Sequence, residues 1–123
     1  MNFARRVQIA AQVVTATQNA LPPALRALAA RVPVHCERVP AEEIIHEGLE
    51  PDILGLFSGP AHGEEGEAGS PLPPQIFLYL DNLWDFAEGD TASFRAEVRL
   101  TYLHELGHYL GWDEDDLAAR GLD

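Results

Sequence analysis

The stretch LTYLHELGHYLGWDEDD, residues 100–116, decides which fold and which chemistry the chain can support. Within it, His104, Glu105 and His108 form the pattern HExxH, in which the two histidines are four positions apart. Residues four apart lie one turn apart on the same face of an α-helix, so both imidazoles can reach one metal ion. Gly111 follows as the expected left-handed helix stop. The stretch therefore predicts a long helix that ends at Gly111 and carries two metal ligands on one face.

The chemistry of these side chains indicates zinc. A catalytic zinc ion usually has three protein ligands, with imidazole nitrogens prominent among them, and one position left for water. We predict His104 and His108 as the first two ligands. The carboxylate of Glu105 is adjacent to the first ligand, where it can take a proton from the metal-bound water, so Glu105 is the predicted catalytic residue. The alternative is a helix that merely carries two exposed histidines and a glutamate, and it predicts no metal.

A third ligand must come from outside the motif. Gly111 lets the chain turn back toward the metal, and a run of four acids follows at residues 113–116. A carboxylate in this run can complete the coordination. The same charges also suit the N-terminus of a short helix, so not every acid of the run is expected to bind metal.

Helices and strands are expected to alternate before the motif helix. Residues 2–20 have an amphipathic pattern and predict a first helix, and the prolines at 22 and 23 suit the start of a second helix over residues 23–32. Three apolar runs predict strands at residues 32–39, 53–59 and 76–80. Pro33 indicates an edge position for the first strand. The continuous apolar character of 76–80 predicts a strand covered on both faces.

The remaining segments connect these elements. Residues 59–74 are rich in glycine, proline and glutamate and predict a loop, and residues 81–89 predict a turn or short helix. Asp90, Thr91 or Ser93 can cap the motif helix. A last short helix is expected at residues 117–122, started by the acids before it. Together the elements predict one α+β domain spanning residues 1–123, with N-terminal helices, a small mixed sheet and the motif helix near the C-terminus.

Charge and composition exclude several classes of function. The net charge is −12, and from residue 41 onward there are 19 acids and three arginines. Such a surface repels the phosphates of nucleic acids. No apolar run approaches the length that crosses a bilayer, so we expect no membrane partner. Glutamines at positions 8 and 12 interrupt the apolar stretch after Arg6, which favours an amphipathic helix over a signal peptide and hence a cytoplasmic protein. Cys36 is the single cysteine, so no intrachain disulfide can form.

The chain resembles the small bacterial zincin-like metallopeptidases, a family of minimal metallopeptidases once known as a domain of unknown function. Three stretches carry the resemblance: LGLFSG at 54–59, IFLYLDNL at 76–83 and HELGHYLGWDE at 104–114. The resemblance implies a compact α+β zincin-like fold and hydrolysis of peptide bonds with Zn²⁺ as cofactor. The family pattern HExxHxxGxx(D/E) places a ligand ten positions after the first histidine. That position is Glu114 here, with Asp113 as the next choice, although the usual residue is aspartate.

Two functions share this metal site. The first is a zinc-dependent metallopeptidase acting on a peptide or protein substrate, in which a tyrosine or histidine holds the oxyanion. The candidates for that role are Tyr79, Tyr102, Tyr109 and His46. The second is a catalytically silent zinc-binding or protein-interaction domain that keeps the fold. The sequence leaves the oligomeric state open, with a monomer as the simpler expectation.

Overall fold

The computed structural model describes residues 1–64 and 72–120. Six helices and three strands lie in these ranges: α1 (Phe3–Asn19), α2 (Pro23–Ala29), β1 (Val34–Glu37), α3 (Glu42–His46), β2 (Gly55–Ser58), β3 (Gln75–Tyr79), α4 (Leu80–Phe86), α5 (Thr91–Tyr109) and α6 (Glu114–Ala119). Residues 65–71, in the middle of the predicted loop, and residues 121–123, which include the last two positions of the predicted final helix, lie outside the described residues. The α+β class and the three predicted strands are confirmed.

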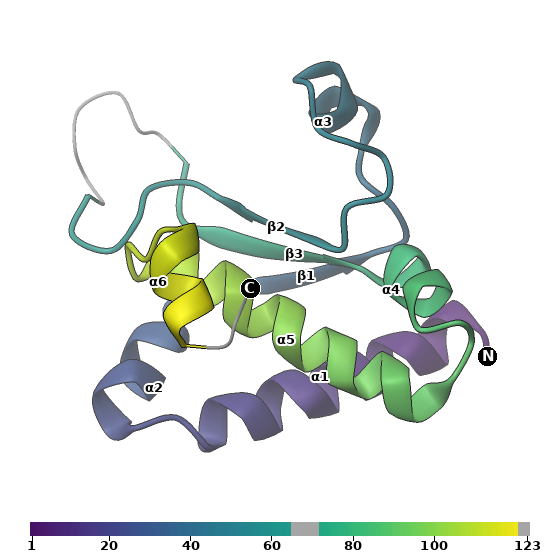
Figure 1. The fold of residues 1–123 in the computed structure, drawn as a ribbon, viewed down its shortest axis with the longest axis horizontal. Helices are drawn as coiled ribbons and strands as arrows, with labels where there is room; N and C mark the ends of the chain where they lie inside the picture. The colour runs from purple at the N-terminus through teal and green to yellow at the C-terminus, as the bar shows by residue number, and fades with distance from the viewer. Residues whose placement is uncertain (65–71, 121–123) are drawn as a thin grey trace.

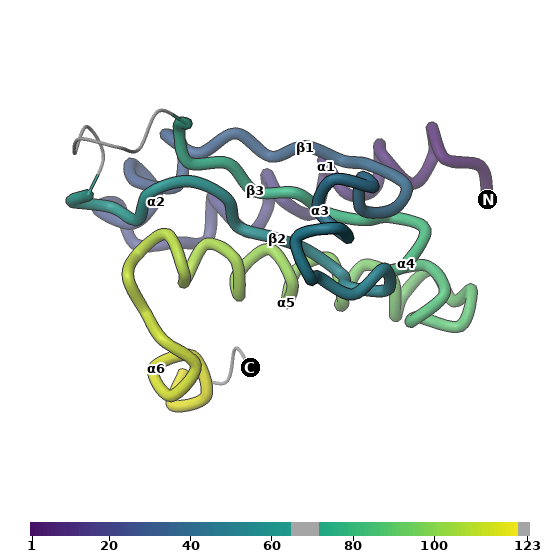
Figure 2. Tube along the Cα trace, turned by 90° about the horizontal axis from the view of Figure 1, so that it is seen from above, coloured from purple at the N-terminus to yellow at the C-terminus, as the bar shows by residue number. Residues whose placement is uncertain are grey.

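The sheet is small and mixed, as expected. Its strand order is β1-β3-β2, with β3 parallel to β1 and antiparallel to β2. The first strand is therefore at an edge, as Pro33 indicated. Figure 2 shows β3 between its two neighbours, with α5 running along the β2 side.

Helices cover one face of the sheet. Figure 1 shows α1 and α5 lying together beneath the strands, while α3 stands on the opposite side. Ile76 and Leu78 of β3 are fully buried. On the opposite face the ring of Phe77 is only half-buried and stacks on that of Tyr79, with centroids 6.5 Å apart. The central strand is thus covered completely on one face and only in part on the other.

Helix α5 supplies much of the core. Its buried apolar side chains are Phe94, Val98, Tyr102, Leu103, Leu106 and Tyr109. The hydroxyl of Tyr102 accepts a hydrogen bond from the amide of Gln18 in α1 at 2.9 Å, which ties the two longest helices together. At the start of α5 the side chain of Asp90 accepts a hydrogen bond from the Ser93 N–H, so Asp90 is the cap. At its end Gly111 has φ +83°, the predicted left-handed stop.

Two helices differ from their predicted ranges for local reasons. Helix α2 ends at Ala29 rather than at 32, because the residue before Pro33 is disfavoured in helical conformation. Helix α6 begins at Glu114 rather than at 117. There Asp113 and Asp116 form a capping box in which each side chain accepts a hydrogen bond from the other residue's backbone N–H.

A glycine lies at a close contact between α5 and the sheet. A Cβ atom built on Gly55 of β2 would lie 2.6 Å from the Thr101 methyl group and 3.0 Å from the Phe77 carbonyl oxygen. The first separation is shorter than real Cβ atoms show and the second is tighter than most, so glycine is what lets strand and helix approach this closely. Across the described ranges, no helix is both long and apolar enough to span a lipid bilayer.

This contact generates a stability prediction. We expect Gly55→Ala to lower the free energy of unfolding, because overpacking a close contact costs about 1–3 kcal/mol. That cost exceeds the roughly 0.4–1 kcal/mol that alanine gains by restricting the unfolded chain. Urea unfolding followed by circular dichroism measures the difference.

The double variant Gly55→Ala/Thr101→Ser removes the methyl group that is nearest to the new Cβ. Compared with Thr101→Ser alone, it should lose less stability than Gly55→Ala loses in the wild-type background. Part of the loss should remain, since the Phe77 carbonyl is backbone and cannot be removed. An alanine variant as stable as the wild type would contradict the close-contact argument.

Candidate metal centre

Helix α5 brings the two motif histidines together. Their spacing of four residues places both rings on one face, and the Nε2 atoms of His104 and His108 are 3.2 Å apart. The rings meet edge to face, with centroids 4.9 Å apart and planes at 80°. Both side chains are half-buried, so they remain open to solvent on one side. Two nitrogen atoms able to bind a metal thus face the same small space.

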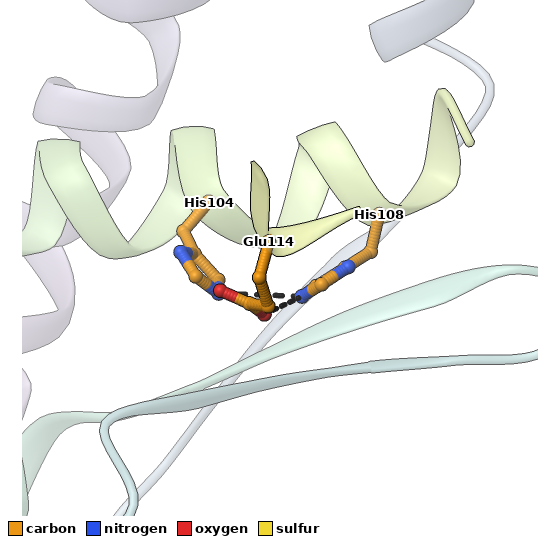
Figure 3. Close-up of side chains that lie close together, drawn as sticks. All are labelled: His104, His108 and Glu114. Carbon is orange, nitrogen blue, oxygen red and sulfur yellow. Dashed lines mark hydrogen bonds and ion pairs between the residues drawn. The ribbon is translucent and has the colours of Figure 1, made fainter. Parts of the chain in front are cut away.

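The turn after Gly111 brings a carboxylate to the same point. Glu114 is the first residue of α6, and its Oε1 atom lies 3.5 Å from the Nε2 atom of His104 and 3.3 Å from that of His108. Figure 3 shows the three side chains pointing toward one another, two from α5 and one from the start of α6. They are the one group of three or more potential metal-binding side chains found in residues 1–64 and 72–120.

These distances fit a tetrahedral zinc ion. Bonds of about 2.0–2.1 Å at tetrahedral angles separate neighbouring ligand atoms by about 3.3–3.4 Å. The three measured separations are 3.2, 3.3 and 3.5 Å. Two imidazoles and one carboxylate also form a donor set that catalytic zinc sites use, with a fourth position left open. The residues present therefore fit zinc in both chemistry and spacing.

The neighbouring acids have other partners. The carboxylate of Asp113 accepts a hydrogen bond from the Asp116 N–H at 2.8 Å, and that of Asp116 accepts one from the Asp113 N–H at 3.0 Å. Both groups are thereby engaged in starting α6. The structure thus brings Glu114, rather than its alternative Asp113, to the histidines, while the role of Glu114 in binding metal remains a prediction.

Glu105 lies in a different environment from Glu114. It is 8% exposed, whereas the side chain of Glu114 is 68% exposed. Burial raises the pKa of the Glu105 carboxyl above its ordinary value. The imidazoles of His104 and His108 act in the opposite direction, as does a hydrogen bond donated by the backbone N–H of Phe57. A carboxylate is therefore held in a mostly desolvated position beside the histidine pair.

The contact with Phe57 was not foreseen from the sequence. Every residue except proline has a backbone N–H, so the residue type at position 57 does not indicate this hydrogen bond. The neighbouring Gly55 did carry a signal, since a glycine inside a strand often marks a close backbone approach. Both residues belong to β2, which is the edge strand on the α5 side of the sheet.

One of the predicted oxyanion candidates, Tyr79, lies within electrostatic reach of Glu105: burial first, and then the charges of Glu37 and Glu105, raise the pKa of its hydroxyl to about 12. Tyr79, Tyr102 and Tyr109 are fully buried, so their side chains are not exposed to a substrate. His46 is exposed at the end of α3. His62, in the loop after β2, donates its backbone N–H to the carbonyl oxygen of Tyr109 at 2.7 Å.

Comparison with known proteins agrees with this geometry. The family model of zincin-like metallopeptidases matches residues 29–122, which is most of the chain. The protein therefore belongs to the zincin-like metallopeptidase family. No curated protein matches the chain at a significant level.

The arrangement predicts which acid matters for metal affinity. We expect Glu114→Ala to weaken zinc binding at least about tenfold, because it removes a donor atom from the converging set. Asp115→Ala is the matched control, since it removes an exposed charge from the adjacent residue of the same helix. Competition with a chromophoric chelator measures both affinities.

A second control tests the alternative ligand. Asp113→Asn removes a charge while keeping an equally good helix cap, so it should leave zinc affinity close to that of the wild type. If Asp113→Asn weakened binding more than Glu114→Ala did, the third ligand would be Asp113.

Proposed function

We propose that the protein is a zinc-dependent peptidase in which His104, His108 and Glu114 hold the metal and Glu105 is the catalytic base. The observation that carries this proposal is the position of Glu105. Its carboxylate is mostly buried, lies next to the histidine pair and is fixed by a backbone N–H of β2. Desolvating a carboxylate costs free energy, so keeping one here is most simply explained by chemistry.

Glu105 would act twice in the hydrolysis of a peptide bond. Zinc, when bound, supplies a Lewis acid that makes water more acidic and polarises a carbonyl group. Glu105 accepts the proton of the attacking water and then delivers it to the nitrogen of the departing amine. Burial raises the pKa of its carboxyl, which makes the carboxylate a stronger base for the first of these transfers.

An extended peptide is the substrate that the surroundings favour. Among the residues that the structure describes, β2 has a neighbouring strand on one side only, and its other side faces the motif helix. An edge strand can pair with an added peptide strand through main-chain hydrogen bonds. A peptide placed there would pass beside Glu105 and the histidines.

The catalytically silent zinc domain remains the second candidate. In its favour, three of the four side chains proposed for holding the oxyanion, those of Tyr79, Tyr102 and Tyr109, are fully buried. Against it stands the buried Glu105, which a protein that only binds zinc does not need. The two functions therefore differ in the role of this one carboxylate.

The variant Glu105→Gln distinguishes the peptidase from the catalytically silent zinc domain. The variant keeps the shape of the side chain and should keep zinc affinity, but we expect its rate of peptide hydrolysis to fall about 10²–10⁴-fold. The zinc-loaded wild type and variant are compared on a peptide library, with cleavage products identified by mass spectrometry. Glu42→Gln, the same change at an exposed position in α3, serves as control. Equal cleavage by wild type and Glu105→Gln would remove the catalytic assignment.

A further inference from the structure

A groove runs along the outer edge of β1. Among the residues that the structure describes, β1 has one neighbouring strand, β3, whereas α5 runs along β2 at the opposite edge of the sheet. The groove has a volume of about 550 Å³ and lies between β1 and α1. Helix α1 lines it with Val7, Ala11, Val14 and Thr15. The edge of a strand and a largely apolar flank of a helix are thus open at the same place.

The main-chain groups of β1 alternate between its two sides. The carbonyl oxygen of Pro33 accepts a hydrogen bond from the Ile76 N–H at 3.0 Å, so it points toward β3. Because successive residues of a strand direct these groups to alternate sides, those of Val34 and Cys36 point away from β3. The side chains of Val34 and Cys36 are half-buried and line the groove. An added strand can therefore hydrogen-bond to these two residues and cover their side chains.

Charge favours a second copy of this chain as the occupant of the groove. Residues 1–36 contain no aspartate or glutamate, although the chain has 20 such residues and a net charge of −12. Two molecules with this net charge repel each other. The repulsion between carboxylates is weakest where each molecule presents α1 and the first residues of β1. The groove lies at that part of the surface.

The sequence of β1 is self-complementary in one antiparallel register. A two-fold axis through Cys36 places His35 directly opposite the partner's Glu37, and symmetry repeats this pair. Each imidazole then faces a carboxylate, to which it can donate a hydrogen bond. An axis through His35 or through Glu37 instead places identical side chains opposite each other, which is unfavourable for like charges. The charges therefore select the register centred on Cys36.

We propose that the protein forms a homodimer in which β1 pairs with the partner's β1 in this register, in place of the monomer that is the simpler expectation from the sequence. The backbone of Cys36 exchanges two hydrogen bonds with that of the partner's Cys36, and the two three-stranded sheets join into one. Strand β2 and the motif helix stay at the outer edges of the joined sheet. The inference is therefore independent of the proposed peptidase function.

Sedimentation velocity of the zinc-loaded protein tests the dimer. We expect the average mass to rise from that of one chain to that of two with increasing concentration. The dissociation constant should be in the micromolar range, because one strand pair and the adjoining helix flanks make a small interface. A single monomeric species up to about 1 mM would overturn the proposal and leave this edge to a strand of another protein.

Charge variants test which side chains face each other. His35→Glu places carboxylates opposite each other at both symmetry-related positions, so we expect it to weaken the dimer at least about tenfold. The double variant His35→Glu/Glu37→His restores the opposite pairing with the positions exchanged, and it should recover most of the wild-type affinity. His46→Glu, the same change at an exposed position in α3, is the matched control and should have no effect. A double variant that is no tighter than His35→Glu would overturn the proposal.

The thiol of Cys36 reports the register directly. In an antiparallel hydrogen-bonded pair the two Cα atoms are about 5.5 Å apart, within the range of about 4.4–6.8 Å that a disulfide needs. Copper phenanthroline with dissolved oxygen, which accepts the electrons, should therefore link two wild-type chains. The variant Cys36→Ser/Val34→Cys moves the thiol to a position opposite the partner's Arg38, and it should give little linkage. Equal linkage by both proteins, or none by the wild type, would overturn the proposal.

Discussion

The close approach of helix α5 to strand β2 is the constraint on which the site depends. Gly55 permits it, because any side chain at that position would collide with Thr101. The same approach brings the backbone of Phe57 within hydrogen-bonding reach of Glu105 and shields that carboxylate from water. The missing side chain of Gly55 thus contributes both to the packing of α5 on β2 and to the environment of Glu105.

Much of the frame could be predicted from local patterns. The motif helix, its stop at Gly111 and its cap at Asp90 each depend on residues close together in the chain, so the sequence contains the whole signal. The return of a carboxylate from residues 113–116 to the histidines was predictable for the same reason, whereas the choice of Glu114 among these acids came from the family resemblance. These interactions could be predicted from the sequence because they join residues that are close together in the chain.

Other features depend on contacts between distant segments. The hydrogen bond from Phe57 to Glu105 joins residues far apart in sequence through a backbone group that every non-proline residue has. The burial of the tyrosines could not be predicted for a related reason. Tyr102 and Tyr109 share α5 with the histidines, but they point into the core, as the three-dimensional packing of α1 and β2 determines. The spacing of apolar residues along α5 does not by itself show which face of the helix packs in the core and which face carries the site.

The three proposed ligands do not share one rigid support. His104 and His108 project from a long helix packed in the core, whereas Glu114 belongs to a helix of six residues whose start is fixed by a capping box. Any ion that engages all three would therefore also fasten α6 to α5. Its apparent affinity would include the free energy of docking this short helix, and the helix would in turn become harder to detach. Metal binding and the docking of α6, whose Leu117 is already buried against Gly107 of α5, would in this way stabilise each other.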